Sequence, residues 1–246
     1  MKRSFHKSWR LYLMEALGLA VFMISACFFG ALFEAKNSFV HQSIQNDFIR
    51  LVLIGMLMGA TALFIFYSRW TAPSGSHINP AVTLAFLRIG RINKYDAFFY
   101  IIFQFIGGTA AVYAMQAITG NMLTAAPVNS AVTVPGKYGV HTAAITEFII
   151  AFIMMTMVLS TSSHQHLKKY TRIIAGCMVC AYVIIAGPIS GFGMNPARSF
   201  ASALPAHIWT SFWIYIIMPV AGMMTATECF LLIQGRIKNK HTMLNA

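Results

Sequence analysis

The chain has 246 residues, of which 58% are hydrophobic and only 10% are charged, and its formal net charge is +12. About a quarter of the residues are charged in an ordinary soluble domain, so this composition excludes one and predicts an integral membrane protein. The basic surplus does not indicate nucleic-acid binding, because it is concentrated in the connecting segments between long apolar stretches.

Six apolar stretches follow one another along the chain, each near the ~20 residues that a helix needs to cross a bilayer. They are Leu11–Leu32, Phe48–Phe66, Tyr95–Ile118, Thr142–Ser160, Ile173–Ala186 and Trp209–Ile233. The first stretch is too long for a cleaved signal peptide, and no typical cleavage site follows it, so we expect it to remain as a membrane helix. The sequence predicts one all-α membrane domain over residues 1–246.

Most of the basic residues lie on one side of this six-helix topology, in the two terminal segments and in two connections. They are Lys2, Arg3, Lys7, Arg10, Arg69, Arg88, Arg91, Lys94, Lys168, Lys169, Arg172, Arg236, Lys238 and Lys240. Because positive charge accumulates on the cytoplasmic side, both termini are expected in the cytoplasm of a plasma or inner cell membrane.

A short motif occurs twice, as SGSHINPAV from Ser74 and as SGFGMNPAR from Ser190. The chain therefore divides into related halves, about residues 8–120 and 140–235. Each half holds three apolar stretches, and an odd number inserts the two copies in opposite orientations, as an inverted repeat. Smaller matches are Glu15 with Glu147, and Gly108 with Gly222.

Each motif reads as the start of a helix, since asparagine is a strong N-cap and proline suits the first helical turn. The helices after Asn79-Pro80-Ala81 and Asn195-Pro196-Ala197 extend only about 8–10 residues, to Arg88 or to just before Pro205, which is half of a membrane crossing. Gly75 and Gly191 permit a tight chain reversal before them. The sequence predicts two re-entrant half-helices.

In an inverted repeat the two half-helices enter from opposite sides, so their N-termini meet near the middle of the membrane. Positive dipole ends and the amides of Asn79 and Asn195 then offer hydrogen-bond donors to a passing oxygen. Such a place favours a neutral hydroxylated molecule and repels a cation. The sequence therefore predicts a channel for water and small uncharged solutes, with no enzyme activity, cofactor or metal.

These motifs resemble those of the aquaporin and aquaglyceroporin family. The resemblance covers nearly the whole chain: six spans, two Asn-Pro-Ala boxes each preceded by Ser-Gly, His77, and Arg198 after the second box. It implies a homotetramer with one pore in each subunit. It also implies a selectivity filter near the outer mouth, which ungapped transfer from the boxes puts at Gly59, Val183, Phe192 and Arg198.

The implied filter is wider and more apolar than that of a water-only pore, since glycine and valine replace a bulky aromatic residue and a histidine. Glycerol-like polyols and metalloid hydroxides are therefore candidate solutes. Other positions match water channels instead: Ser199, Ala203 and Tyr215, although Ile216 does not. A water-selective pore remains the alternative.

Several polar residues have two interpretations. Intramembrane Glu15 and Glu147 indicate either a proton relay or, as the resemblance favours, hydrogen-bonded support of the re-entrant loops. His77 either lines the approach to the first box or packs there. His164 and His166 suit a pH sensor, a metal site or, more simply, a solvated loop.

Three rival functions are weaker. A secondary active transporter also uses inverted repeats and broken helices, but it needs an ion-coupling acid near the midplane. An intramembrane enzyme needs a catalytic pair or metal cluster, and Cys177-x-x-Cys180 alone, inside an apolar stretch, indicates packing. A cation channel is disfavoured by Arg198 and the converging helix dipoles.

Overall fold

The computed structural model describes residues 2–244, with the side chains of residues 5–235. Within this part the protein is entirely helical, and six helices are long and apolar enough to cross a membrane. These are α1 (Lys2–Glu34), α3 (Asp47–Tyr67), α5 (Lys94–Thr119), α7 (Gly139–Ser162), α8 (Thr171–Ser190) and α10 (Trp213–Leu244). The predicted fold class is confirmed. Five of these helices extend beyond the predicted apolar stretches at both ends, whereas α10 begins four residues after the predicted start at Trp209.

Shorter helices complete the fold. The half-helices are α4 (Pro80–Arg88) and α9 (Pro196–Ala206), and α9 includes Pro205 in its last turn rather than ending before it. Outside the spans lie α2 (Phe39–Ser43) and α6 (Asn121–Thr124). Single 3₁₀ turns occur at Ala72–Ser74, Asn129–Ala131 and Lys168–Tyr170.

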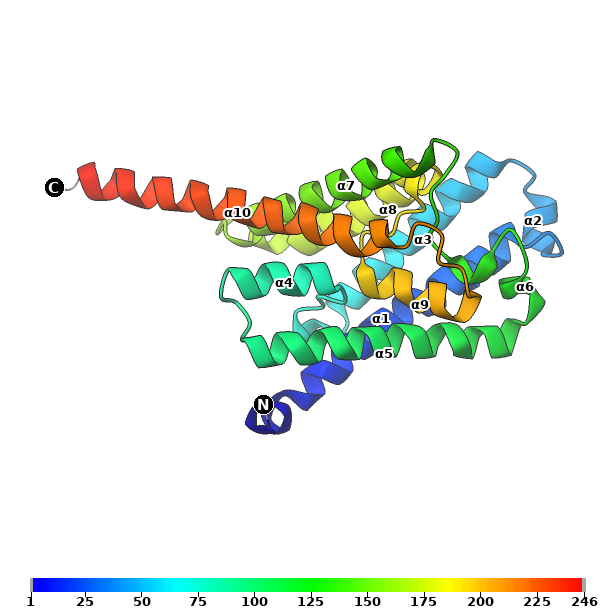
Figure 1. The fold of residues 1–246 in the computed structure, drawn as a ribbon, viewed down its shortest axis with the longest axis horizontal. Helices are drawn as coiled ribbons and strands as arrows, with labels where there is room; N and C mark the ends of the chain where they lie inside the picture. Colours follow the sequence, from blue (N-terminus) through cyan, green and yellow to red (C-terminus); the bar gives the residue numbers. More distant parts are fainter. Residues whose placement is uncertain (1, 245–246) are drawn as a thin grey trace.

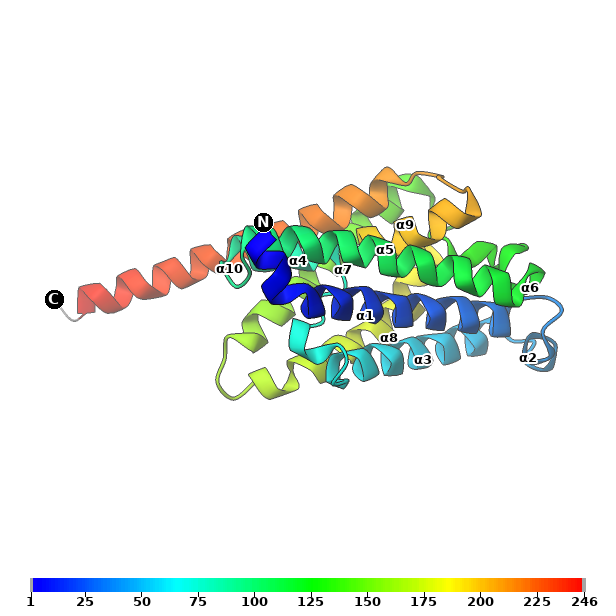
Figure 2. The ribbon, with the colours of Figure 1, turned by 90° about the horizontal axis from the view of Figure 1, so that it is seen from below.

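Both chain ends lie at one end of the bundle, which we call the terminal end (Figure 1). The connection between α7 and α8 lies at this end as well (Figure 2), whereas α2 and α6 lie at the other, the distal end. The basic side chains of Lys2, Arg3, Arg236, Lys238 and Lys240, which contributed to the predicted orientation, fall outside the described side chains.

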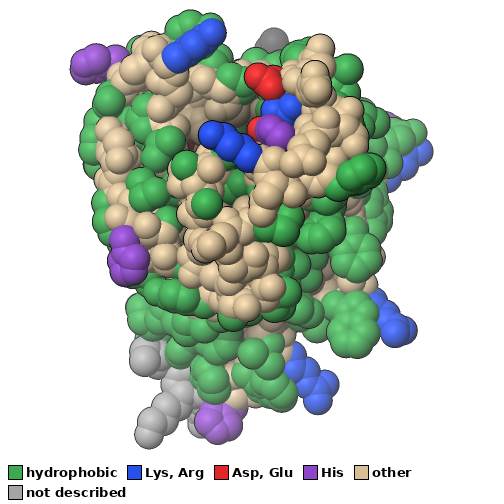
Figure 3. All heavy atoms as spheres, turned by 90° about the vertical axis from the view of Figure 1, so that its right-hand side faces the viewer, with side chains coloured by type: hydrophobic (Ala, Val, Ile, Leu, Met, Phe, Trp, Pro, Cys, Tyr) green, Lys and Arg blue, Asp and Glu red, His purple; other side chains and the backbone are tan. Residues whose placement is uncertain are grey.

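A buried arginine organises the distal end. Arg50 at the start of α3 is 4% exposed. It forms ion pairs with Glu34 at 3.2 Å and with Asp47 at 2.7 Å, which tie the end of α1 to α3. Figure 3 looks onto this end of the molecule and shows acidic, basic and histidine side chains close together on it.

Glycines allow the first and third long helices of each half to touch backbone to backbone. A Cβ atom at Gly107 of α5 would lie 2.2 Å from the carbonyl oxygen of Ala16 in α1. One at Gly222 of α10 would lie 2.4 Å from the carbonyl oxygen of Phe148 in α7. Gly107 therefore has the position equivalent to Gly222, and the expected match of Gly108 with Gly222 is wrong by one residue. Gly108 instead faces side chains of α1 and α9.

Candidate functional site

Each half-helix is preceded by a loop with the same backbone conformation. The glycines Gly75 and Gly191 have φ angles of +91° and +82°. Two later residues in each loop are also left-handed: Ser76 and Ile78 in one, Phe192 and Met194 in the other. Left-handed backbone is uncommon for non-glycine residues and a clear outlier for β-branched Ile78, so the surrounding structure must hold both loops firmly.

The asparagine of each box caps its half-helix. Asn79 Oδ1 accepts from the backbone N–H of Ala81 at 2.9 Å. Asn195 Oδ1 accepts from the N–H groups of Ala197 at 3.0 Å and Arg198 at 3.2 Å. These are N-terminal donors that no carbonyl within the helix can accept from, and proline at the first position removes another such donor.

The two asparagines also link the half-helices to each other. Asn79 Nδ2 donates to the carbonyl oxygen of Met194 at 2.8 Å, and Asn195 Nδ2 donates to that of Ile78 at 2.7 Å. The N-termini of α4 and α9 therefore meet end to end in the interior, as the arrangement of the two helices in Figure 1 also shows. A primary amide has two N–H groups. Each link uses one, which leaves a second donor on each asparagine.

Buried Glu15 of α1 holds the first loop. Its carboxyl group accepts from the backbone N–H groups of His77 at 2.9 Å and Ile78 at 2.6 Å. It also accepts from Ser74 Oγ at 2.6 Å and from Gln104 Nε2 at 2.7 Å. Four donors from α5 and the loop thus meet on a single carboxyl group, which is the bracing arrangement.

Buried Glu147 of α7 holds the second loop in the matching way. Its carboxyl group accepts from the N–H groups of Gly193 at 2.8 Å and Met194 at 2.5 Å, and from Ser190 Oγ at 2.6 Å. No proton-relay partner is needed to explain either acid, because loop donors surround both.

One tyrosine fixes the start of each loop, and the sequence did not single out either residue for this role. Tyr100 of α5 donates to the carbonyl oxygen of Ser74 at 2.8 Å. Tyr215 of α10 donates to that of Ser190 at 2.6 Å. Tyr100 and Tyr215 occupy matching places in the third span of each half, and this repetition is a sequence signal that could have indicated the contacts.

A cavity of about 310 Å³ leads from the terminal end of the bundle to the asparagines, and we call it the vestibule. Its deep end is lined by Asn79, Asn195 and the two loops. Its walls are mostly apolar, with phenylalanine and methionine side chains from α1, α3, α4, α7 and α10. No acidic residue lines it.

His77 lines the vestibule and is also well packed, so both interpretations of this residue describe the same position. Its ring stacks on Phe86 with centroids 4.7 Å apart. Its Nδ1 atom lies 3.2 Å from Thr83 Oγ1. The imidazole is therefore held rigidly beside the first box.

Gly59, which the resemblance puts in the selectivity filter, lies against α8. A Cβ atom at Gly59 would lie 2.8 Å from Cys180 Cβ and 3.0 Å from the carbonyl oxygen of Gly176, both on α8. Gly55, one turn earlier, faces the carbonyl oxygen of Cys180 in the same way. Glycines four residues apart are typical of close packing between membrane helices.

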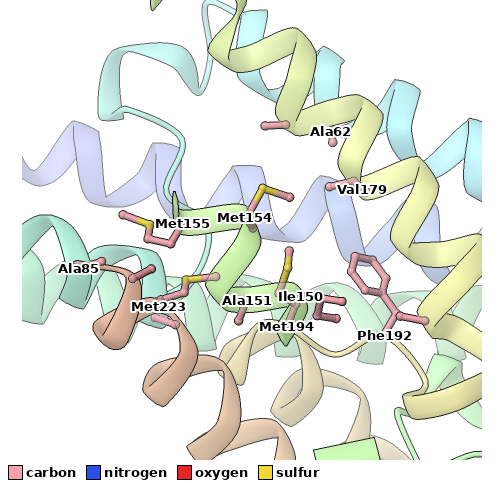
Figure 4. Packing of buried hydrophobic residues seen from close by; sticks show 14 of the residues in the cluster. Ala62, Ala85, Ile150, Ala151, Met154, Met155, Val179, Phe192, Met194 and Met223 are labelled. Atoms are coloured by element: carbon pink, nitrogen blue, oxygen red, sulfur yellow. The ribbon is translucent and has the colours of Figure 1, made fainter. Parts of the chain in front are cut away.

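The inward side of α3 also carries larger side chains. Ala62 and Phe66 line the vestibule, and Met58 lies one turn before Ala62 on the same helix face. Met58 is 4% exposed and belongs to the apolar cluster that contains Phe192. Val183 of α8 packs against that cluster. Figure 4 shows its centre, with Phe192, Val179, Met154 and Met194 gathered between α7 and α8.

Arg198 lies in the first turn of α9. Its Nη1 atom is buried, and no group in the described part of the chain forms a hydrogen bond with it. The hydroxyl of Tyr182, whose ring centroid is 6.1 Å from that of Phe192, is likewise buried and without a protein partner in the described residues. An arginine is costly at membrane depth, and a free donor there marks a place for a polar ligand or water.

Other candidates from the sequence lie elsewhere. The four cysteines are free. Cys177 is exposed on the outside of the bundle, so the expected packing is not found for it within this chain, and Cys180 is partly buried. His164 and His166 lie in the exposed connection between α7 and α8, with ring centroids 5.8 Å apart. Within the described residues no three His, Cys, Asp or Glu side chains are grouped as metal ligands.

Comparisons with known proteins agree with this geometry. The family described as major intrinsic protein matches residues 2–230. The chain is 31% identical to Aquaporin TIP2-1 of Arabidopsis thaliana over 218 residues, which are 87% of this chain and 83% of that protein. It is 34% identical to Aquaporin NIP1-4 of Oryza sativa subsp. japonica over 163 residues, 65% of this chain and 58% of that protein.

Among solved structures, the aquaglyceroporin from Plasmodium falciparum superimposes with a TM-score of 0.75. The sequence identity is 18%, and the match covers 89% of this chain and 93% of that one. This likeness establishes the shared fold.

Glu147→Ala should strongly destabilise the protein, because it leaves the buried backbone N–H groups of Gly193 and Met194 without an acceptor, at roughly 1–3 kcal/mol each. Glu147→Gln keeps one acceptor oxygen and should cost less. The thermal unfolding midpoint of the purified protein in detergent measures both.

Glu228→Ala is the matched control for Glu147→Ala. Glu228 is about half exposed and pairs with Arg88 at 2.6 Å, so its loss should change stability by less than about 1 kcal/mol. Equal midpoints for Glu147→Ala and Glu228→Ala would show that the second loop does not depend on its carboxyl support.

Proposed function

The chain belongs to the major intrinsic protein family of membrane channels, and we propose that its pore passes the paired asparagines and then an arginine-containing constriction. As a member of this family it is a multi-pass membrane protein and a passive channel for water or small solutes, not an enzyme. The observation that carries the proposed route is the end-to-end meeting of α4 and α9 at the closed end of the vestibule.

The asparagines are the polar step of the proposed route. Each keeps one N–H donor after capping and cross-linking, and both line the vestibule. A water or hydroxyl oxygen that arrives between apolar walls exchanges a hydrogen bond to water for one to these amides. A cation meets two positive helix ends and no acidic lining, so its desolvation is not compensated.

The constriction that we propose lies on the distal side of the asparagines and consists of Met58, Val183, Phe192 and Arg198. Three apolar side chains share one cluster or pack against it, and the buried Nη1 of Arg198 supplies a donor for the solute oxygen. With methionine in place of a bare glycine wall, this opening is narrower than the sequence indicated. Water is then the principal solute, and polyols or metalloid hydroxides pass only to the extent that Met58 moves aside.

Further family properties belong to the same proposal. We place both termini in the cytoplasm of a plasma or inner membrane, so that the vestibule opens to the cytoplasm and the constriction faces outward. One pore in each subunit of a homotetramer is the assembly that the family resemblance implies.

Arg198→Ala should remove the charge barrier and the solute-oxygen donor of the constriction, so proton or sodium leakage should appear while osmotic water flux persists. Stopped-flow light scattering and a pH-sensitive dye in proteoliposomes measure the two fluxes side by side. A correctly folded variant that conducts water and excludes ions as well as the parent does would remove Arg198 from the constriction.

Met58→Ala should widen the constriction and raise glycerol or urea flux relative to water by several-fold, whereas Met58→Leu, which nearly conserves volume, should leave the ratio nearly unchanged. Stopped-flow measurements with each solute in turn, scaled to the amount of folded protein, give the ratio.

Gly59→Phe distinguishes a constriction lined by Met58 from one lined by Gly59. Because Gly59 faces the α8 backbone, the ring should impair folding and lower water and solute fluxes in the same proportion. A well-folded Gly59→Phe variant that loses only the flux of larger solutes would show that Gly59 lines the pore, and it would contradict the role of Met58.

A further inference from the structure

The mouth of the vestibule is strongly basic. Lys168 and Arg172 line the vestibule at the terminal end, together with the hydroxyl residues Ser162 and Thr171. Arg91, in the connection after α4, donates to Ser162 Oγ at 3.0 Å and to Ser163 Oγ at 2.9 Å, which brings a third cation to the same rim. Three positive groups and several hydroxyls thus surround one opening.

The acidic groups of the chain are all used elsewhere. The sequence contains six Asp and Glu residues. Glu15 and Glu147 are buried beneath the loops, and Glu34 and Asp47 pair with the distal-end arginine. Asp96 accepts from Tyr12 and Asn93, and Glu228 pairs with Arg88.

Lys168 and Arg172 consequently have no ion pair with an acidic residue among the described residues. Both side chains are exposed, and the Arg172 guanidinium carbon lies 5.4 Å from the centroid of the Tyr67 ring. No acidic side chain competes with a mobile anion where these two cations converge on the cavity.

We propose that this mouth binds inorganic phosphate or another phosphate monoester, and that the bound anion obstructs the path to the asparagines. Arginine recognises phosphate with a planar fork, and lysine adds a point charge. The Thr171 hydroxyl already donates to Thr161 Oγ1 at 2.8 Å, so the charged groups carry the recognition. The obstruction rests on the proposed channel function, whereas the binding does not.

Binding is tested by isothermal titration of the purified full-length protein with inorganic phosphate at constant ionic strength. Lys168→Ala and Arg172→Ala should each weaken binding by about tenfold, as expected for lost hydrogen bonds to a charged group, with Arg172→Lys intermediate. Lys169→Ala is the matched control: it removes the neighbouring charge in the same turn, but Lys169 is not in the vestibule wall and lies over the Tyr170 ring.

The expected result is that Lys169→Ala changes the affinity by less than about twofold. Size-exclusion profiles and thermal midpoints establish that each variant is folded. Absence of phosphate binding to the parent protein, or an equal loss with Lys169→Ala and Lys168→Ala, would overturn the site.

The obstruction is tested by osmotic water flux in proteoliposomes loaded with phosphate or with chloride. Phosphate should slow the parent protein with a midpoint near its dissociation constant and should have little effect on a Lys168→Ala, Arg172→Ala double variant. Binding without slowing overturns the obstruction alone. Absence of facilitated flux in chloride overturns the channel function instead and leaves the binding result standing.

The phosphate group has two natural sources, a soluble monoester and a lipid headgroup. Titrations in phosphatidylcholine nanodiscs with and without phosphatidic acid distinguish them. Unchanged affinity for soluble phosphate identifies the soluble ligand, and a phosphatidic-acid-dependent loss of that affinity identifies the headgroup. Both outcomes support the phosphate site, provided that Lys168→Ala weakens the interaction.

Discussion

Irregular backbone at membrane depth must have its N–H groups satisfied, and in this protein two buried carboxyl groups meet that requirement. Without water in the hydrocarbon region, an unpaired N–H is too costly for a loop to persist there. Glu15 and Glu147 each accept two loop N–H groups together with a serine hydroxyl. The carboxyl groups thereby stabilise left-handed backbone conformations that the loop residues would otherwise not adopt.

The rest of the site follows from these fixed loops. Once both loops are held, α4 and α9 begin at the same point from opposite sides. Each asparagine then donates to the carbonyl oxygen of the residue that precedes the other asparagine. The same amides that cap the helices keep one N–H donor each. Capping and the link between the half-helices are thus made by the same two residues, which explains why both boxes begin with asparagine.

Much of this arrangement could be predicted from the sequence because it depends on local rules. Asn-Pro marks a helix start wherever it occurs, and Gly75 and Gly191 do have the left-handed backbone that a tight reversal requires. Glu15 and Glu147 lie inside apolar stretches, where an acidic side chain has few possible roles.

The direction in which a side chain points around its helix axis could not be predicted from the sequence. Counting residues from a box fixes the depth of a residue in its helix, but each residue turns the side chain by about 100°. For this reason the sequence matched Gly108 with Gly222, although Gly107 has the equivalent contact. The same uncertainty applies to Gly59, which packs on α8, and to its neighbour Met58, which belongs to the buried apolar cluster. Tyr100 was missed because its partner lies 26 residues away in the chain.

The channel function that we propose needs no conformational cycle during transport, and the temperature dependence of osmotic water flux tests this most directly. Stopped-flow shrinkage of proteoliposomes, measured between about 5 and 35 °C beside protein-free vesicles, yields the activation energy of each. A channel of this kind should show a low activation energy close to that of water diffusion, clearly below that of the bare bilayer. An activation energy as high as that of the lipid, or a flux that saturates with an imposed ion gradient, would contradict it.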